Sequence, residues 1–252
     1  MSGHSKWSKV KHFKGKIDAA RSRAFSRCGK EIAVAARVGG GDPNFNPRLR
    51  SAIEMAKAEN MPNDNIERAI KRGTGEIGGV VYEEALYEGY APGGVAVIVE
   101  ALTDNKNRSA AEIRSIFSKY GGNLAAPGAV VFQFKRQGVI TVARDKIAED
   151  ELMSLVLEAG ADDLKTEGDE YEVYTSVENF AAVVESLKKS KIEPASAKLS
   201  YVPQNTVPLN DEAAVRKVLN MIEALDEHDD VQRLHSNFDA PDAILEKIHA
   251  SA

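Results

Sequence analysis

The spacing of apolar residues changes from helical to strand-like near Gly73. Before this point apolar side chains recur every three or four positions, most clearly from Lys16 to Val38, which predicts helices with one buried face. After it, β-branched runs such as Val95–Val99 alternate with helical segments. We therefore predict an α+β chain, in which an N-terminal helical domain (residues 1–80) is followed by units that contain sheet.

Two further helices are predicted within the first domain. Asn46 followed by Pro47 is a favourable helix start. Another helix is expected from Asn63 to Arg72, with Gly73 at the position just beyond its end. This part of the chain is thus expected to form a small helical domain.

The middle of the chain has the element order of a ferredoxin-like unit. Strands and helices are expected to alternate as β-α-β-β-α-β between Val139 and Val202. The pattern allows the flanking elements either to complete one sheet around this unit or to form a second unit in tandem with it. The flanking elements are a strand from Val95 to Thr103, a helix from Ser109 to Tyr120, a helix from Asp211 to Leu225 and a strand from Val231 to Phe238.

The charge of the chain is strongly asymmetric. Through Arg72 there are 16 Lys/Arg and 7 Asp/Glu, a local charge of +9, whereas the whole chain carries −5. A basic domain on an otherwise acidic chain indicates a polyanionic partner such as nucleic acid. The acidic remainder would repel phosphates and so direct the basic domain toward them.

A stripe of cations is expected along the first helix. It consists of residues at seven-residue intervals, with one arginine between them: Lys16, Arg23, Arg27, Lys30 and Arg37. Such a stripe can follow a phosphate backbone, so we predict that it binds nucleic acid. The alternative is an ordinary solvated polar face.

The segment before this helix, residues 3–14, is rich in cations and too polar to bury a core by itself. We predict that it binds phosphates while Trp7 or Phe13 stacks on unpaired bases; alternatively, the two rings hold the segment against its own domain. It lacks the long apolar core of a secretory signal, which predicts a cytoplasmic protein. The nucleic-acid-binding residues expected in this segment and in the helix are Lys6, Trp7, Lys9, Lys11, His12, Lys14, Lys16, Arg21, Arg23, Arg27, Lys30 and Arg37.

A second anion contact is predicted where a strand gives way to a helix. Lys106 and Arg108 stand at the expected helix N-terminus, where backbone N–H groups already favour an anion. Both are therefore candidates for contact with a phosphate or a carboxylate. The alternative is a turn in which Asp104 and Asn105 cap the chain locally.

No motif in the sequence identifies an enzyme, a cofactor or a metal. Gly73–Gly78 matches the dinucleotide-binding glycine pattern but follows a helix, so we interpret it as a helix stop and linker. Cys28 is the only cysteine, and its helical spacing predicts a packed thiol. His228 lies among acids from Asp226 to Asp230, which we interpret as a solvated helix end. We expect no catalysis, no cofactor and no metal.

Several separated motifs occur in order along the chain. They are Gly3–Trp7, Val38–Pro43, Asn46–Arg50, Asn60–Pro62, Ile66–Ile70, Tyr87–Val95, Thr103–Arg108 and Gly121–Leu124. On these motifs the chain resembles the YebC/PmpR family over nearly its full length. One departure is Phe25–Lys30, where the family more often has a bulky apolar pair and this chain has Gly29. The resemblance implies three domains with the middle one split: 1–80, 81–134 plus 204–240, and 135–203.

The resemblance also implies a regulatory protein that binds nucleic acid. The function that this resemblance has traditionally implied is that of a DNA-binding transcriptional regulator. Such a protein would neutralise phosphates and read the bases only to a limited extent. The family also resembles mitochondrial translational activators of cytochrome oxidase and has members implicated in relieving ribosome stalling at proline-rich stretches. The alternative is therefore a ribosome-associated translation factor that binds ribosomal or transfer RNA. In either case the acidic domains would meet transcription or ribosomal proteins, and no membrane partner is expected.

A third class of function needs no nucleic acid. In a protein-interaction scaffold, the basic face would serve solubility alone. Such a scaffold predicts no salt-dependent affinity for nucleic acid.

Overall fold

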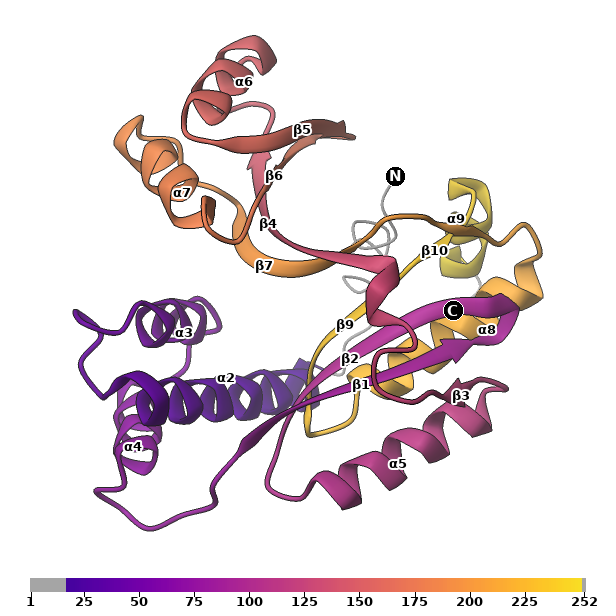
Figure 1. Cartoon of the computed structure of the whole chain (residues 1–252), viewed down its shortest axis with the longest axis horizontal. Coiled ribbons are helices and arrows are strands. Elements are labelled where there is room, and N and C mark those ends of the chain that lie inside the picture. Colours follow the sequence, from indigo (N-terminus) through magenta and orange to yellow (C-terminus); the bar gives the residue numbers. More distant parts are fainter. Residues whose placement is uncertain (1–16, 251–252) are drawn as a thin grey trace.

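The computed structural model describes residues 17–250, in which a domain of packed helices precedes two units built on sheets (Figure 1). The helices of the first domain are α2 (Ile17–Gly39), α3 (Pro47–Ala58) and α4 (Asn63–Thr74). Their apolar faces share one core, in which Cys28 and Ile32 of α2 are buried, so the packed thiol is confirmed. α3 begins as predicted, because Asn46 Oδ1 accepts the N–H of Leu49 at 3.0 Å. The helical N-terminal domain is confirmed.

The end of α4 differs from the prediction. The helix continues through Gly73 to Thr74 and ends at Gly75, whose φ of +82° is the left-handed conformation typical of a helix C-cap. Gly73 instead faces α2, where an added Cβ atom would lie 2.3 Å from the Ala33 carbonyl oxygen. The prediction that Gly73 ends the helix is wrong, because this glycine serves close helix packing and not a special backbone conformation.

The middle unit is an antiparallel sheet with the strand order β3-β1-β2-β9. Central strand β2 is apolar on both faces: Val97 and Val99 join the core under the helices, and Ala96 and Ile98 join the opposite one. Strand β9 follows the ferredoxin-like unit in sequence and pairs with β2, which precedes that unit. Strands from before and after the ferredoxin-like unit therefore form one sheet. Its elements are β1 (Glu83–Ala91), β2 (Val95–Thr103), α5 (Lys106–Lys119), β3 (Asn123–Leu124), α8 (Glu212–Asp226) and β9 (Val231–Ser236).

The inserted unit has the ferredoxin-like order and forms the upper lobe in Figure 1. Its antiparallel sheet has the order β5-β6-β4-β7, and its helices bury Leu152 and Val183 against Ile140 and neighbouring strand residues. The α+β fold class, with a ferredoxin-like unit inserted in the other sheet unit, is confirmed. The elements are β4 (Phe134–Ala143), α6 (Glu149–Glu158), β5 (Ala161–Glu167), β6 (Glu170–Thr175), α7 (Phe180–Lys189) and β7 (Ser196–Pro203).

The C-terminal region differs from the prediction in two ways. The strand expected to reach Phe238 ends at Ser236, because Asn237 interrupts it and accepts the Ala96 N–H with its side-chain oxygen at 2.8 Å. Phe238 then begins β10 (Phe238–Asp239), which pairs with β8 (Val207–Pro208). Helix α9 (Asp242–Ala250) was not predicted. Within residues 17–250, no helix is both long and apolar enough to cross a membrane.

Two glycines in adjoining helices give opposite expectations for alanine. A Cβ atom on Gly29 would meet Met61 Cε at 3.8 Å, an ordinary contact, so Gly29→Ala should raise the free energy of unfolding by about 0.5–1 kcal/mol. Gly73→Ala should lower it by about 1–3 kcal/mol, because the new methyl group would overlap the Ala33 carbonyl oxygen. Denaturant unfolding measures both; changes of the same sign would contradict the packing of α4 on α2.

Candidate nucleic-acid interface

Lys30, which was expected to contact phosphate, is buried between the helical domain and the middle unit and is 8% exposed. Its Nζ donates to Asp230 Oδ1 at 2.7 Å and to the Asp229 carbonyl oxygen at 2.9 Å. A longer contact of 3.4 Å reaches the Leu102 carbonyl oxygen, and the Tyr82 ring centre lies 5.2 Å away. Lys30 therefore joins α2 to the turn before β9 and to the end of β2.

Two arginines on the preceding turns of α2 meet the same acidic segment. Arg27 forms an ion pair with the Asp226 carboxylate at 3.3 Å and also donates to the Asp226 carbonyl oxygen. Arg23 lies 3.7 Å from the Glu227 carboxylate in a more exposed pair. We call Arg23, Arg27 and Lys30 the inner cations, and residues 226–230 the acidic turn. The inner cations of the predicted stripe thus face acids of this same chain.

Asp230 is the centre of this contact and is 3% exposed. Its carboxylate accepts hydrogen bonds from Arg108 Nη2 and Ser109 Oγ, each at 2.7 Å, and from Thr103 Oγ1 at 3.1 Å. Burial alone would raise the pKa of this carboxyl, but the hydrogen bonds from Lys30, Ser109 and Arg108 outweigh it and hold the pKa well below its ordinary value. The carboxylate is therefore ionised and lies against two cations.

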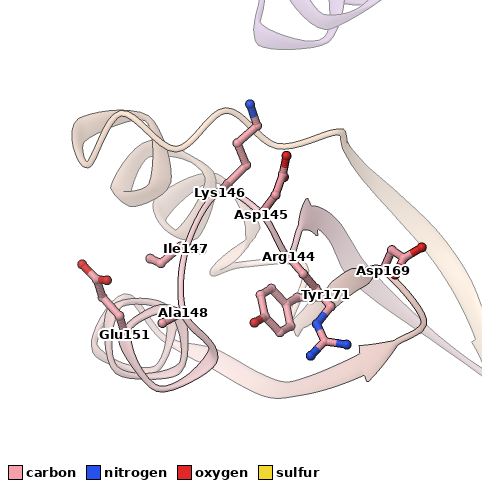
Figure 2. Close-up of a pocket in the computed structure, with 8 residues that line it drawn as sticks. All are labelled: Arg144, Asp145, Lys146, Ile147, Ala148, Glu151, Asp169 and Tyr171. Atoms are coloured by element: carbon pink, nitrogen blue, oxygen red, sulfur yellow. The ribbon is translucent and has the colours of Figure 1, made fainter.

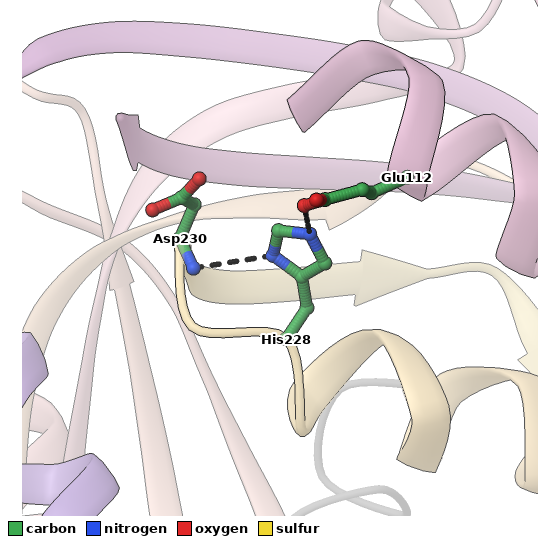
Figure 3. Close-up of side chains that lie close together, drawn as sticks. All are labelled: Glu112, His228 and Asp230. Atoms are coloured by element: carbon green, nitrogen blue, oxygen red, sulfur yellow. Dashed lines mark hydrogen bonds and ion pairs between the residues drawn. The ribbon is translucent and has the colours of Figure 1, made fainter. Parts of the chain in front are cut away.

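The interpretation of Asp226–Asp230 as a solvated helix end is correct for the end of α8 (Glu212–Asp226) and for the exposed Glu227 and Asp229, but it is wrong for Asp230. Asp230 is buried, and the cation that Asp230 meets on α2 is 200 residues away in sequence. His228 supports the turn: its Nδ1 accepts the Asp230 N–H at 3.1 Å, and its Nε2 lies 2.8 Å from Glu112 Oε2 (Figure 3). The local sequence shows the acidic residues but not the distant residues that pack around Asp230 and bury it.

Glu112, His228 and Asp230 place possible metal ligands within 4.8 Å of one another (Figure 3). The chemistry around them does not favour a metal ion. The Asp230 carboxylate already receives Lys30 and Arg108, and a divalent cation beside these two would be repelled by both. We therefore interpret the three residues as a support for the acidic turn.

Lys106 and Arg108 lie in the first turn of α5, and both already contact carboxylates. Lys106 Nζ is 2.8 Å from a carboxylate of β1, and Arg108 binds both Asp104 and Asp230. Asn105 Oδ1 accepts the Arg108 N–H at 3.1 Å, so the local cap considered as the alternative is present. The cap and carboxylate contacts coexist at this turn, and contact with a phosphate stays a prediction.

Arg48 of α3 forms ion pairs with Glu31 and Glu84, but several other cations of the helical domain are exposed and form no direct ion pair with an acid within the described part of the chain. Arg37 lies in the last turn of α2, Lys57 in that of α3, and Arg68 and Lys71 lie in α4. We call these four the outer cations. They include only one member of the predicted stripe, Arg37. Their charge is available to an anion from solvent.

The remaining predicted residues divide into one that is described and several that are not. Arg21 is exposed near the start of α2, with its guanidinium 5.4 Å from the centre of the Phe25 ring. Its contact with nucleic acid stays a prediction. The predicted residues that lie outside the described range are Lys6, Trp7, Lys9, Lys11, His12, Lys14 and Lys16.

A shallow, polar pocket lies in the ferredoxin-like unit, away from these cations (Figure 2). Arg144 lies over the Tyr171 ring, 5.7 Å from its centre, and Lys146 and Asp145 point away from that ring. The lining mixes both signs of charge, including Glu151, and contains none of the predicted site residues. It does not contribute to the candidate interface.

Sequence reasoning missed two residues of this region, Asp230 and Phe45. Phe45 lies between α2 and α3 and is 86% exposed. A phenylalanine between Asn44 and Asn46, in a turn otherwise made of glycine, proline and polar residues, is the signal that marks it. The acid at position 230 carries no comparable local signal.

Removing the inner lysine should destabilise the protein. Lys30→Met leaves the buried Asp230 carboxylate with one cation fewer, so we expect the free energy of unfolding to fall by about 3 kcal/mol. The matched control is Lys189→Met, which removes an exposed pair with Glu185 and should leave stability unchanged. Urea unfolding of both variants is the measurement. Equal stability of the two would contradict the structural role of the buried pair.

The low pKa of Asp230 also predicts a pH dependence. Because this pKa is lower in the folded chain than the unfolded value of about 3.9, ionisation of Asp230 stabilises the fold above that pH. The contribution is lost as the pH falls toward the folded-state pKa. The stability difference between wild type and Asp230→Asn should therefore be largest near about pH 6–7 and shrink below about pH 4. A difference that stays constant on acidification would contradict this assignment.

Models of one family match most of the chain. They are the TACO1/YebC protein N-terminal domain over residues 5–76 and the TACO1/YebC second and third domain over residues 82–238. A probable transcriptional regulatory protein of Sulfurihydrogenibium sp. (strain YO3AOP1) is 53% identical over 249 residues, which covers 98% of this chain and 99% of that protein. One from Syntrophobacter fumaroxidans is 53% identical over 248 residues, which covers 98% and 100%.

A solved structure agrees with these sequence matches. The crystal structure of a conserved hypothetical protein from Aquifex aeolicus has a TM-score of 0.82 to this chain at 48% sequence identity. The match covers 90% of this chain and 94% of that one. On the family models and these relatives, the chain belongs to the YebC/PmpR family.

Proposed function

We propose that this chain is a regulatory protein that binds nucleic acid through its helical domain. The observation that carries the proposal is the set of exposed outer cations on a domain of positive charge within an acidic chain. A phosphate backbone is the partner that such a surface attracts most strongly. The names of the relatives, probable transcriptional regulatory proteins, support a role in regulation.

The inner cations have a different part in this proposal. Arg23, Arg27 and Lys30 hold the helical domain against the acidic turn, while the outer cations meet phosphates. The proposed binding surface therefore consists of Arg37 and the exposed cations of α3 and α4, and not of the whole stripe predicted along α2. Contact of the inner cations with phosphate stays a prediction.

The proposal has two forms, both placed in the cytoplasm and neither with a catalytic step. In the first, the protein binds duplex DNA and regulates transcription, as the names of its relatives suggest. In the second, it binds RNA and acts on translation; the exposed ring of Phe45 favours this form, because aromatic side chains stack on unpaired bases. Cross-linking in cells followed by sequencing of bound DNA and RNA separates the forms by enrichment of promoters or of ribosomal and transfer RNA.

Binding should depend steeply on salt. If about six phosphates are contacted, the logarithm of the affinity for duplex DNA should fall with the logarithm of salt concentration with a slope of about −5. Replacing Arg37, Arg68 and Lys71 together by alanine should flatten this slope by about two to three units. Fluorescence anisotropy of a labelled duplex at several potassium chloride concentrations measures both slopes.

The matched control replaces three exposed lysines of the ferredoxin-like unit, Lys135, Lys146 and Lys188, by alanine. This control removes the same number of positive charges and should leave the slope unchanged. An outer-cation variant with the wild-type slope would reject the assigned surface. A wild-type protein without salt-dependent affinity for DNA or RNA would reject the proposed function.

A further inference from the structure

Phe45 is the most notable apolar side chain on the surface of the helical domain, with 86% of its surface exposed. A single exposed apolar residue is common on proteins, so exposure alone indicates little. Two further observations distinguish this residue. The turn that carries Phe45 is held rigidly, and cations lie on both sides of it.

Hydrogen bonds fix the backbone around Phe45. Asp42 Oδ1 accepts the Asn44 N–H at 2.9 Å, and the Asp42 carbonyl oxygen accepts the Phe45 N–H at 3.2 Å. Arg50 donates to the Pro43 carbonyl oxygen at 3.0 Å and to the Asn44 carbonyl oxygen at 3.1 Å. These bonds restrain the backbone that carries the ring.

Asn46 anchors the same turn to α2 and is 4% exposed. Its Nδ2 donates to the carbonyl oxygens of Ala35 and Gly40, each at 2.8 Å. A Cβ atom on Gly39 would lie 2.6 Å from Asn46 Nδ2, so this approach requires glycine. The turn is therefore preorganised with Phe45 in solvent, and a ligand that stacks on the ring needs little ordering of the protein.

Cations flank the turn on three helices. Arg37 precedes it at the end of α2, and Arg50 follows it in α3; both are exposed. The turn also packs on α4, because a Cβ atom on Gly41 would lie 3.2 Å from the side chain of Ile70, the residue before Lys71. An aromatic ring among cations is the combination by which proteins hold single-stranded nucleic acid, with the ring on a base and the cations on phosphates.

We propose that Phe45 stacks on an unpaired base of single-stranded RNA while the outer cations Arg37 and Lys71 hold the neighbouring phosphates. This rests on the proposed nucleic-acid binding and specifies its ligand. RNA presents unpaired bases in loops, bulges and ends, whereas duplex DNA keeps its base faces stacked inside the helix. A duplex would therefore meet the cations but offer the ring no base face.

The test compares the binding of the full chain to labelled oligouridine of about twelve nucleotides with its binding to a labelled DNA duplex. Phe45→Ala should weaken RNA binding by about 5- to 100-fold and leave duplex affinity unchanged. Phe45→Tyr keeps a stacking ring and should bind RNA like the wild type. The matched control is Phe132→Ala, which removes a ring that is 68% exposed in η2 (Val131–Gln133) and should change neither affinity.

The outcomes separate this proposal from the proposed function. Unchanged RNA affinity of Phe45→Ala would overturn the stacking assignment and point to a protein as the partner of the ring. An equal loss on RNA and duplex would overturn it too, because stacking acts only on the single strand. Wild-type binding to duplex without binding to RNA would overturn this proposal alone, whereas binding to neither would remove both.

Discussion

The arrangement of the helical domain on the middle unit depends on the buried carboxylate of Asp230. An ionised carboxylate out of water is unfavourable unless hydrogen bonds and opposite charges replace its hydration. Here Lys30 comes from α2, Arg108 and Ser109 come from the first turn of α5, and the acid itself ends the acidic turn. The charge is satisfied only when these three segments meet. The same contact that offsets desolvation thus specifies how the domains sit together.

This contact also distinguishes two sets among the cations of the helical domain. The inner cations face acids of the same chain, whereas the outer cations face solvent. The net charge of +9 through Arg72 does not show which cations are paired with acids and which are exposed. In the proposed mode of binding, a phosphate backbone would therefore meet the outer cations more readily than Arg23, Arg27 and Lys30, which are already paired with acids.

The elements with local signals could be predicted, and those that depend on distant partners could not. The spacing of apolar residues predicts α2, and the Asn46 cap predicts the start of α3, because both signals involve residues that are close in sequence. The role of Gly73 was predicted wrongly, because the sequence does not distinguish a glycine that allows two helices to pack closely from one that adopts a positive φ. Helix α9 has only nine residues, so its apolar residues Ile244, Leu245 and Ile248 show helical spacing over little more than one turn. The partner of Lys30 lies 200 residues away, so no local pattern reports that the predicted site residue is buried.

Charge and ring have separate consequences for selectivity in the proposed mode of binding. The outer cations would meet phosphates of any nucleic acid, because a phosphate contact carries no information on base pairing. The acids elsewhere in the chain repel a polyanion, which favours approach toward the helical domain. Among the described residues of this surface, discrimination between a single strand and a duplex then depends on Phe45, which needs an open base face. A rigid turn suits that role, since a ring already held in solvent loses little freedom when a base stacks on it.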